Sequence, residues 1–281
     1  MALFRVFVAA CFAFALSVSA SLGSAAPQRI VSINACTDQL LFRLADHERI
    51  AALSVYAADP TLSIDADKVR ARGVPLIRGS AEEVLKLKPD LVLAGVWTRR
   101  ATRDRLKAEG LRLEEFATPN NLEAVKAGIR RMADLLGETG RGDAILRDLE
   151  AAESSASSAS RGLTALQFQR RGYTSGEGTL ISDLLHVVGL GNAAGGLGVR
   201  SVGPVSLESV LKTRADLLVL LDAAPAANDQ GTALLYHPVL LAAYPPEHRI
   251  IVPANLTVCG GPAIAIALER LAEAIRRLPP R

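Results

Sequence analysis

The chain has 281 residues, of which 49% are hydrophobic and 22% charged, and its formal net charge is +3. This is the composition of a globular protein long enough for one large or two medium domains. The small net charge and the lack of a Lys/Arg-rich run argue against nucleic acid as a partner.

The N-terminal residues 1–25 predict a secretory signal peptide. One Arg is followed by an apolar stretch through Leu16 and then by small residues, and cleavage after Ala20 or Ala25 fits the small-x-small rule. One alternative is a membrane anchor, for which the apolar run is near the lower length limit. Another is a lipoprotein signal ending at Cys11, but the apolar region continues past that residue. We therefore expect an exported protein.

From Arg29 onward, short apolar runs alternate with amphipathic stretches. Strands are expected at 29–33, 49–54, 90–95 and 112–116, and helices near 37–45, 81–88, 99–110 and 121–137. Asn120 and Asn121 are suited to cap the last of these helices, and Gly137 to end it. Strands separated by helices, with few hairpin signals, indicate a parallel α/β sheet.

The next segment, residues 138–160, predicts a connection between two lobes. A helix from Arg141 to about Ala156 is long enough to cross from one lobe to the other. A flexible Ser-rich linker is the equal alternative for residues 154–160.

After Arg161 the α/β pattern restarts. Strands are expected at 163–168, 216–222 and 249–253, helices at 178–189, 206–213, 234–243 and 263–278, and a Gly-rich loop at 189–204. The restart predicts an N-terminal lobe at 26–137 and a C-terminal lobe at 161–281. Ligands in such sheets bind beyond the carboxyl ends of the strands, so the residues after each strand should line a cleft between the lobes.

Common catalytic motifs are missing from the sequence. It has no GxxxxGK[ST], GxSxG or HExxH, and its Gly-x-Gly follows a helix rather than a strand. The four histidines fall in predicted helices, caps or loops, so we expect no metal site. Cys259 lies in a Gly-rich turn that could activate a thiol, but no His follows a comparable strand. A secreted α/β enzyme using Cys259 is therefore the alternative, and we expect no catalysis.

Each lobe places an Arg doublet and an aromatic residue after a strand, near the expected cleft. These residues are Trp97, Arg99 and Arg100 in the first lobe and Arg170, Arg171 and Tyr173 in the second. Arg presents a planar fork to carboxylates or phosphates, and Trp and Tyr cover flat apolar surface. The alternative for any one Arg is that it merely begins a solvated helix.

Two segments repeat one helix-to-strand unit. "SAEEVLKLKPDLVLAG" begins at Ser80 and "SLESVLKTRADLLVLL" begins at Ser206, which places Glu82 and Glu208 at equivalent positions. Ser at a helix N-cap and Glu in the first turn are favoured in any helix, so the pair has an ordinary structural explanation as well.

These two segments, with "RIVSINACTDQLLFRL" and "QFQRRGYTSGEGTLISDLLHVVGLGN", resemble the periplasmic binding proteins for cobalamin and iron chelates. The resemblance covers essentially the whole mature chain. It implies two α/β lobes joined by one long helix, a periplasmic monomer without cofactor, and delivery of a metal chelate to the membrane subunits of an ABC importer. It also implies that Glu82 and Glu208 dock onto arginines of those subunits, with Glu83 as a possible substitute for Glu82.

The resemblance implies a ferric siderophore, a corrinoid or haem as cargo, and we expect them in that order. Aromatic residues are only 4% of the chain, which disfavours cobalamin, and Tyr173 is the only candidate axial haem ligand at a strand end. The Arg doublets favour an anionic chelate. A sensor or chaperone-like module without a transporter is a further alternative.

Cys36 and Cys259 remain after cleavage and follow strands of opposite lobes. An even pair in an oxidising compartment invites a disulfide. However, a bond between the lobes would lock the cleft. We therefore expect free thiols near the ligand, or packing roles.

Overall fold

The computed structural model describes residues 26–157, 162–221 and 230–278. The expected signal peptide and residues 158–161 of the Ser-rich segment lie outside this part of the chain. Among the residues described, no helix is both long and apolar enough to cross a membrane.

The N-terminal lobe is built on a five-stranded parallel sheet in the order β3-β2-β1-β4-β5. The strands are β1 (Ile30–Ser32), β2 (Ile50–Ser54), β3 (Leu76–Ile77), β4 (Leu91–Gly95) and β5 (Leu113–Phe116). The helices are α1 (Ala35–Leu44), α2 (Ala66–Ala71), α3 (Ala81–Lys86), α4 (Arg100–Ala108) and α5 (Leu122–Leu136). Every residue of β1 and β4 is buried, as expected for parallel strands with both faces covered.

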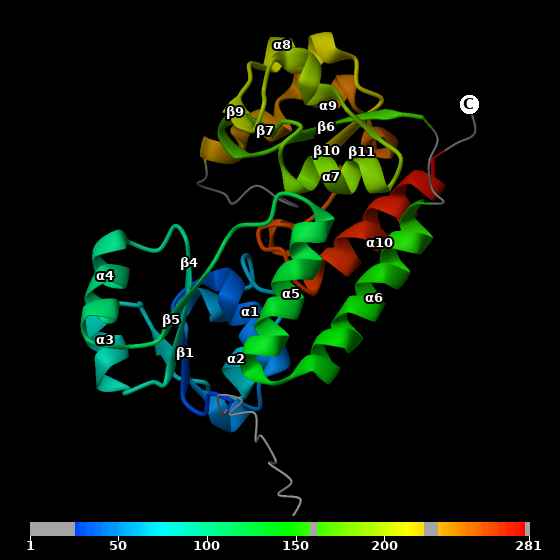
Figure 1. The fold of residues 1–281 in the computed structure, drawn as a ribbon. Helices are drawn as coiled ribbons and strands as arrows, with labels where there is room; N and C mark the ends of the chain where they lie inside the picture. Colours follow the sequence, from blue (N-terminus) through cyan, green and yellow to red (C-terminus); the bar gives the residue numbers. More distant parts are fainter. Residues whose placement is uncertain (1–25, 158–161, 222–229, 279–281) are drawn as a thin grey trace, which may run out of the picture.

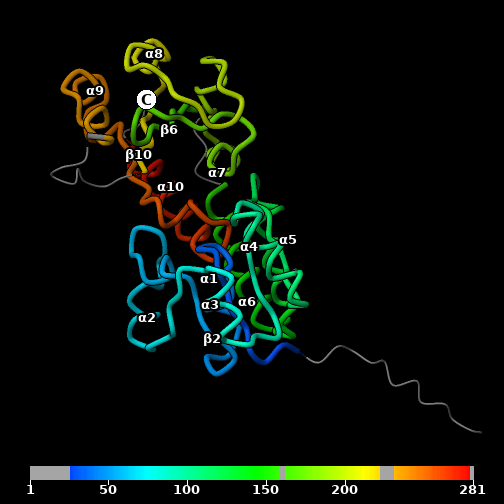
Figure 2. The backbone as a smooth tube through the Cα atoms, turned by 90° about the vertical axis from the view of Figure 1, so that its left-hand side faces the viewer, coloured from blue at the N-terminus to red at the C-terminus, as the bar shows by residue number. Residues whose placement is uncertain are grey.

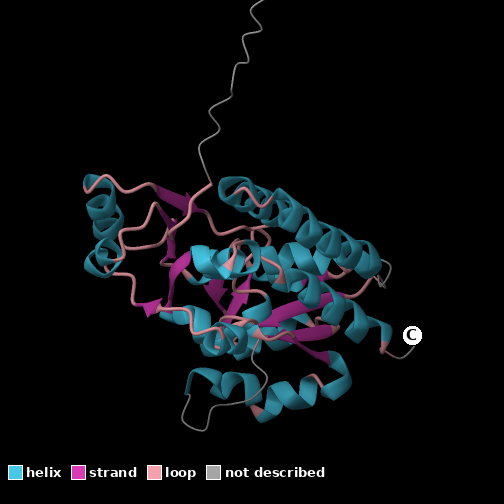
Figure 3. Ribbon diagram, turned by 90° about the horizontal axis from the view of Figure 1, so that it is seen from below, coloured by secondary structure: helices cyan, strands magenta, loops and turns pink. Residues whose placement is uncertain are grey.

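The C-terminal lobe repeats this plan with a four-stranded parallel sheet in the order β11-β10-β6-β8. Its strands are β6 (Thr164–Phe168), β8 (Gly191–Asn192), β10 (Leu217–Leu220) and β11 (Arg249–Ile251), and β7 (Tyr173–Ser175) pairs antiparallel with β9 (Val202–Pro204). Its helices are α7 (Leu180–Val187), α8 (Leu207–Thr213), α9 (Pro238–Ala243) and α10 (Ala263–Arg276). Seen from below, helices lie on both sides of the strands (Figure 3).

Short 3-10 helices connect these elements. They cover His47–Arg49, Val55–Ala58, Arg170–Gly172, Ala193–Leu197, Gln230–Tyr236, Pro246–His248 and Ala254–Leu256.

One long helix, α6 (Thr139–Ser157), runs from one lobe to the other, and α10 packs along it (Figures 1 and 2). Its 19 residues span about 28 Å at about 1.5 Å per residue. The largest cluster of buried apolar side chains contains Leu41 of α1, Leu149 of α6, Leu184 of α7 and Leu268 of α10. The expected fold class, two α/β lobes joined by one long helix, is confirmed.

The local signals at α5 are confirmed, whereas one expected helix is wrong. Asn121 accepts a hydrogen bond from the Ala124 N–H at 2.7 Å, and Gly137 ends α5 in the left-handed conformation. Residues 234–243 do not form one helix. A 3-10 helix ends at Tyr236 and α9 begins at Pro238, because proline lacks the N–H that a helix interior requires.

The expectation of free thiols is wrong, because Cys36 and Cys259 form a disulfide with their Cα atoms 5.1 Å apart. Cys259 follows a strand of the C-terminal lobe, but its segment lies against the N-terminal lobe. A Cβ on Gly260 would lie 2.0 Å from the Cγ of Pro119, so only glycine permits this approach. The disulfide therefore fastens the 259–261 turn to α1 and leaves open the two pockets described below.

Two hydrogen bonds also join segments of the two halves of the chain. The Asp183 carboxylate on α7 accepts from the Leu122 N–H at 2.7 Å and so satisfies a donor at the start of α5. The Asn255 side-chain amide donates to the Pro60 carbonyl at 2.9 Å.

Removal of the disulfide by the double substitution Cys36→Ser and Cys259→Ser should lower the free energy of unfolding by about 2–4 kcal/mol. The bond links residues 223 positions apart, so it restricts the unfolded chain strongly. Urea denaturation without reductant measures the change, and the reduced wild type should unfold at the midpoint of the variant. Equal midpoints for the variant and the oxidised wild type would contradict the prediction.

Candidate ligand-binding cleft

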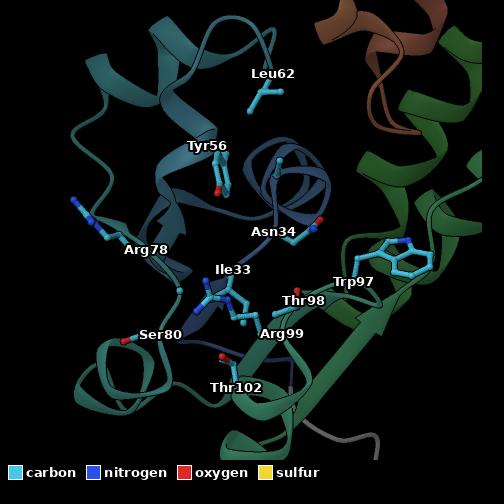
Figure 4. A pocket seen from close by; sticks show the side chains of 12 residues that line it. Ile33, Asn34, Tyr56, Leu62, Arg78, Ser80, Trp97, Thr98, Arg99 and Thr102 are labelled. Atoms are coloured by element: carbon cyan, nitrogen blue, oxygen red, sulfur yellow. The ribbon is translucent and has the colours of Figure 1, made fainter. Parts of the chain in front are cut away.

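The larger of two pockets at the strand ends lies within the N-terminal lobe and has a volume of about 690 Å³. Residues that follow β1, β2, β3 and β4 line it, as a parallel sheet requires of a site at its carboxyl edge. We call it the N-lobe pocket; Figure 4 shows its side chains. The residues on which the argument depends are Asn34, Tyr56, Arg78, Ser80, Trp97 and Arg99.

Asn34 is fixed in this pocket by its role as the N-cap of α1. Its side-chain oxygen accepts hydrogen bonds from the N–H groups of Cys36, at 2.9 Å, and Thr37, at 3.4 Å. A Cβ on Gly95 would lie 2.6 Å from Nδ2 of Asn34, so a glycine at the end of β4 is what admits this amide. The amide Nδ2 is thereby held at the carboxyl end of the sheet.

The second pocket, of about 520 Å³, lies between the two lobes, and we call it the interlobe pocket. The N-terminal lobe contributes residues that follow β5, and the C-terminal lobe contributes residues around β6, β7, α7, β10 and β11. Its polar lining residues are Thr118, Asn120, Gln169, Ser175, Thr179, Ser201 and Thr257. None of its lining residues in the described part of the chain is charged.

Trp97 lines both pockets and is 84% exposed. It lies two residues after the end of β4, where the sequence predicts an aromatic residue at the cleft. An exposed indole does not gain the free energy of burying its apolar surface. A flat ligand that covered the ring would supply that burial. Trp97 is therefore the side chain that connects the two pockets into one cleft.

Of the other residues expected at the ligand, only Arg99 lines either pocket. Arg100 is the first residue of α4, its side chain is 87% exposed, and it pairs with Asp104 at 3.3 Å. In the C-terminal lobe, Arg171 adopts a left-handed conformation that turns the chain back, so that Gln169 pairs with Tyr173. The tight turn points Gln169 toward the interlobe pocket, while Arg170, Arg171 and Tyr173 are exposed and outside its lining. A ligand role for these last residues stays a prediction, as it does for Cys36 and Cys259, which line neither pocket.

The sequence analysis missed several lining residues. Arg78 follows β3, a strand of two residues that is too short for a recognisable apolar run. Tyr56 belongs to the 3-10 helix after β2. Asn34 and Gln169 directly follow expected strands, so the rule that strand ends line the cleft could have included them.

A buried acid lies next to the N-lobe pocket. Asp38, in the first turn of α1, is 1% exposed and accepts hydrogen bonds from the Ser54 hydroxyl and, at 3.2 Å, from the Ser54 N–H. Burial raises the pKa of Asp38 to about 7, and hydrogen bonds from Ser32 and Ser54 offset only part of that effect. Asp38 therefore ties α1 to the end of β2, the strand that precedes Tyr56.

Glu82 and Glu208 both lie exposed in the first turns of capped helices, on α3 and α8. Hydrogen bonds from its own backbone N–H and from the Ser80 hydroxyl lower the pKa of Glu82. Glu83 instead completes a capping box, accepting from the Ser80 N–H at 3.0 Å. Glu83 is therefore engaged in the capping box, and Glu82 is the more exposed acid of the two.

The family model described as "Periplasmic binding protein" matches residues 30–254. The chain belongs to this family. Among its relatives is a cobalamin-binding protein of Halobacterium salinarum, 24% identical over 258 residues, which are 88% of this chain and 69% of the relative.

Two solved structures resemble this periplasmic binding protein in fold. The periplasmic heme binding protein HutB of Vibrio cholerae has a TM-score of 0.72 and 17% identity, over 90% of this chain and 99% of that one. An ABC-type Fe3+-hydroxamate transport system from Saccharomonospora viridis has a TM-score of 0.68 and 20% identity, over 89% and 93%. The family consists of substrate-binding proteins of transporters, and the alternative of a Cys259 enzyme is not supported. Cys259 is also bonded to Cys36 and only 2% exposed, so it offers no thiolate.

The raised pKa of Asp38 predicts that the contribution of this carboxyl to stability falls as the pH rises from about 4 to about 7. The unfolded chain loses this proton near its ordinary pKa of 3.8, whereas the folded protein keeps it until about pH 7. Across that window the folded state binds more protons, so a higher pH favours unfolding. Asp38→Asn should remove this part of the pH dependence.

Urea denaturation at pH 5 and at pH 8 measures the effect. Asp134→Asn, at an exposed position on α5, is the matched control and should keep the wild-type difference between the two pH values. An unchanged difference in Asp38→Asn would show that Asp38 ionises normally in the folded protein.

Proposed function

We propose that this periplasmic binding protein captures a metal chelate between its lobes and delivers it to the membrane subunits of an ABC importer, without catalysis. The observation that carries the proposal is Trp97, an exposed indole shared by two pockets at the carboxyl ends of the strands. A flat, partly conjugated ligand is what such a side chain binds well.

The named cargoes of the similar proteins are cobalamin, heme and an Fe3+-hydroxamate, which are all metal chelates. For this chain we keep the order ferric siderophore, corrinoid, haem. We propose Trp97 and Arg99 as ligand contacts and add Tyr56 and Arg78, because these four side chains line one pocket.

We further propose that the protein works in the periplasm as a monomer, after removal of the signal peptide, with no cofactor and no nucleic-acid partner. The lobes would extend over residues 26–137 and 161–281. A sensor or chaperone-like role would use the same cleft but would need no transporter.

Docking to the importer would use Glu82 and Glu208, one on each lobe. Figure 1 shows α3 at the outer part of the N-terminal lobe and α8 at the far end of the C-terminal lobe. Glu208 pairs with Lys212 at 2.7 Å on an exposed surface, and such a pair exchanges readily for an arginine of a partner. Two separated carboxylates would fix orientation more than they add affinity.

Titration with a chelate should quench the fluorescence of the mature protein saturably, because Trp97 is its only tryptophan. Trp97→Ala should bind the same chelate about tenfold more weakly, since an aromatic contact contributes about 0.5–1.5 kcal/mol beyond the burial of its area. Calorimetry measures the affinity of the variant, which has no indole. Unchanged binding by Trp97→Ala would place the ligand elsewhere.

The combined substitution Glu82→Lys and Glu208→Lys should abolish chelate uptake in cells that carry the importer, with chelate affinity unchanged. Charge reversal turns two attractive contacts with arginine into repulsive ones. Glu247→Lys, at another exposed position of the C-terminal lobe, is the control and should transport normally. Normal uptake by the double variant would favour the role without a transporter.

A further inference from the structure

The two halves of the cleft differ in charge. Arg78 and Arg99 line the N-lobe pocket, and none of its lining residues that the structure describes is acidic. The interlobe pocket has no charged lining residue in the described part of the chain. Glu177 and Arg200 flank its lining segments in sequence but are not among its lining residues. The sequence predicted arginines on both sides of the cleft; among the residues that the structure describes, arginines line only the N-lobe pocket.

Arg99 precedes a helix, α4, whose own cationic side chains are all paired within the described part of the chain. On α4, Arg100 pairs with Asp104, Arg105 pairs with Glu109 at 2.7 Å, and Lys107 pairs with Glu115 at 2.6 Å. Arg103 also pairs with Glu115. The side chains of Arg99 and Arg78 have no hydrogen bond or ion pair to any residue that the structure describes.

The position of Arg99 also costs stability. It is the N-cap of α4, whose first turn contains no acid, so its charge lies at the positive end of the helix dipole. An N-cap usually carries a side chain that accepts a hydrogen bond, and arginine cannot do so. An anion bound to Arg99 would offset the unfavourable charge.

The neighbours of Arg99 suit a flat ligand with anionic groups. Figure 4 shows Arg99 in the middle of the view, with Trp97 and Arg78 on opposite sides and Tyr56 facing the same space. Guanidinium groups bind carboxylate or phenolate oxygens with charge-assisted hydrogen bonds, while Trp and Tyr cover conjugated surface. On the other side of Trp97, Asn120, Gln169 and Ser175 offer neutral donors and acceptors.

We infer that the cargo is an iron chelate whose anionic groups lie on one side, bound by Arg99 and Arg78, with its uncharged part against the C-terminal lobe. This inference rests on the proposed function and names the ligand class for the same cleft. Ferric catecholates and carboxylates share this chemistry with haem, which carries its carboxylates on one edge. Neutral trihydroxamates do not.

The test is calorimetric titration of the mature protein with a ferric tricatecholate, ferric citrate, haemin, a neutral ferric trihydroxamate and cyanocobalamin. At least one anionic chelate should bind more tightly than both uncharged ones. Arg99→Gln should weaken that binding about 10- to 100-fold, since hydrogen bonds to charged groups are strong, and Arg78→Gln should weaken it less. The affinity of the wild type should fall as salt is raised.

Arg100→Gln is the matched control, because Arg100 begins the same helix but is paired with Asp104 outside the pocket. It should bind like the wild type. Arg99→Gln should melt at the same temperature as the wild type or higher, which separates a lost ligand contact from a lost fold.

The outcomes separate this inference from the proposed function. Arg99-dependent binding of the tricatecholate, of citrate or of haemin supports the inference and shows which anionic chelate is the cargo. The inference is overturned if the trihydroxamate or cyanocobalamin binds most tightly. It is also overturned if Arg99→Gln and Arg100→Gln lose the same amount of chelate affinity. In both cases the protein still binds a chelate, so the proposed function stands. Binding of no chelate at all overturns both.

Discussion

A continuous hydrophobic core through both lobes is the constraint on which the rest of the structure depends. The helix α6 crosses between the lobes and α10 returns along it, and both contribute to one buried cluster that also includes side chains of β1 and β10. Small residues make the close packing possible: a Cβ on Gly142 of α6 would lie 2.5 Å from the Cβ of Ala133 on α5. Because dense packing resists continuous deformation, the lobes cannot separate widely without breaking this core.

This packing also explains how an interlobe disulfide is compatible with an open cleft. The turn that contains Cys259 already rests on the N-terminal lobe through Gly260, so the bond to Cys36 reinforces an existing contact. With one side of the molecule fixed by α6, α10 and this turn, the strand ends of the two lobes stay close enough for Trp97 to line both pockets. In our proposal, ligand capture would then need only small movements of the two lobes.

The same rigidity fixes where the two exposed glutamates lie relative to each other. Glu82 and Glu208 belong to short helices whose starts are fixed by Ser80 and Ser206, so the position of each carboxylate follows the position of its lobe. In our proposal a partner that binds both carboxylates would sense the arrangement of the lobes. In our proposal the unfavourable charge of Arg99 at the start of α4 has a functional reason as well, because that residue would bind the ligand.

The sequence by itself determined the alternation of strands and helices, its restart in a second lobe, the caps of α3, α5 and α8, and the position of Trp97 after a strand. These features depend on patterns within about a dozen residues, because hydrophobic periodicity and helix capping are local properties of the chain. Only the tertiary structure decided which residues after a strand face the cleft. Gln169 lines the interlobe pocket beside the left-handed turn at Arg171, and Arg78 lines the N-lobe pocket after a strand of only two residues. The disulfide likewise joins residues 223 positions apart, and their proximity depends on how the segment after β11 packs across the lobes, which no local pattern encodes.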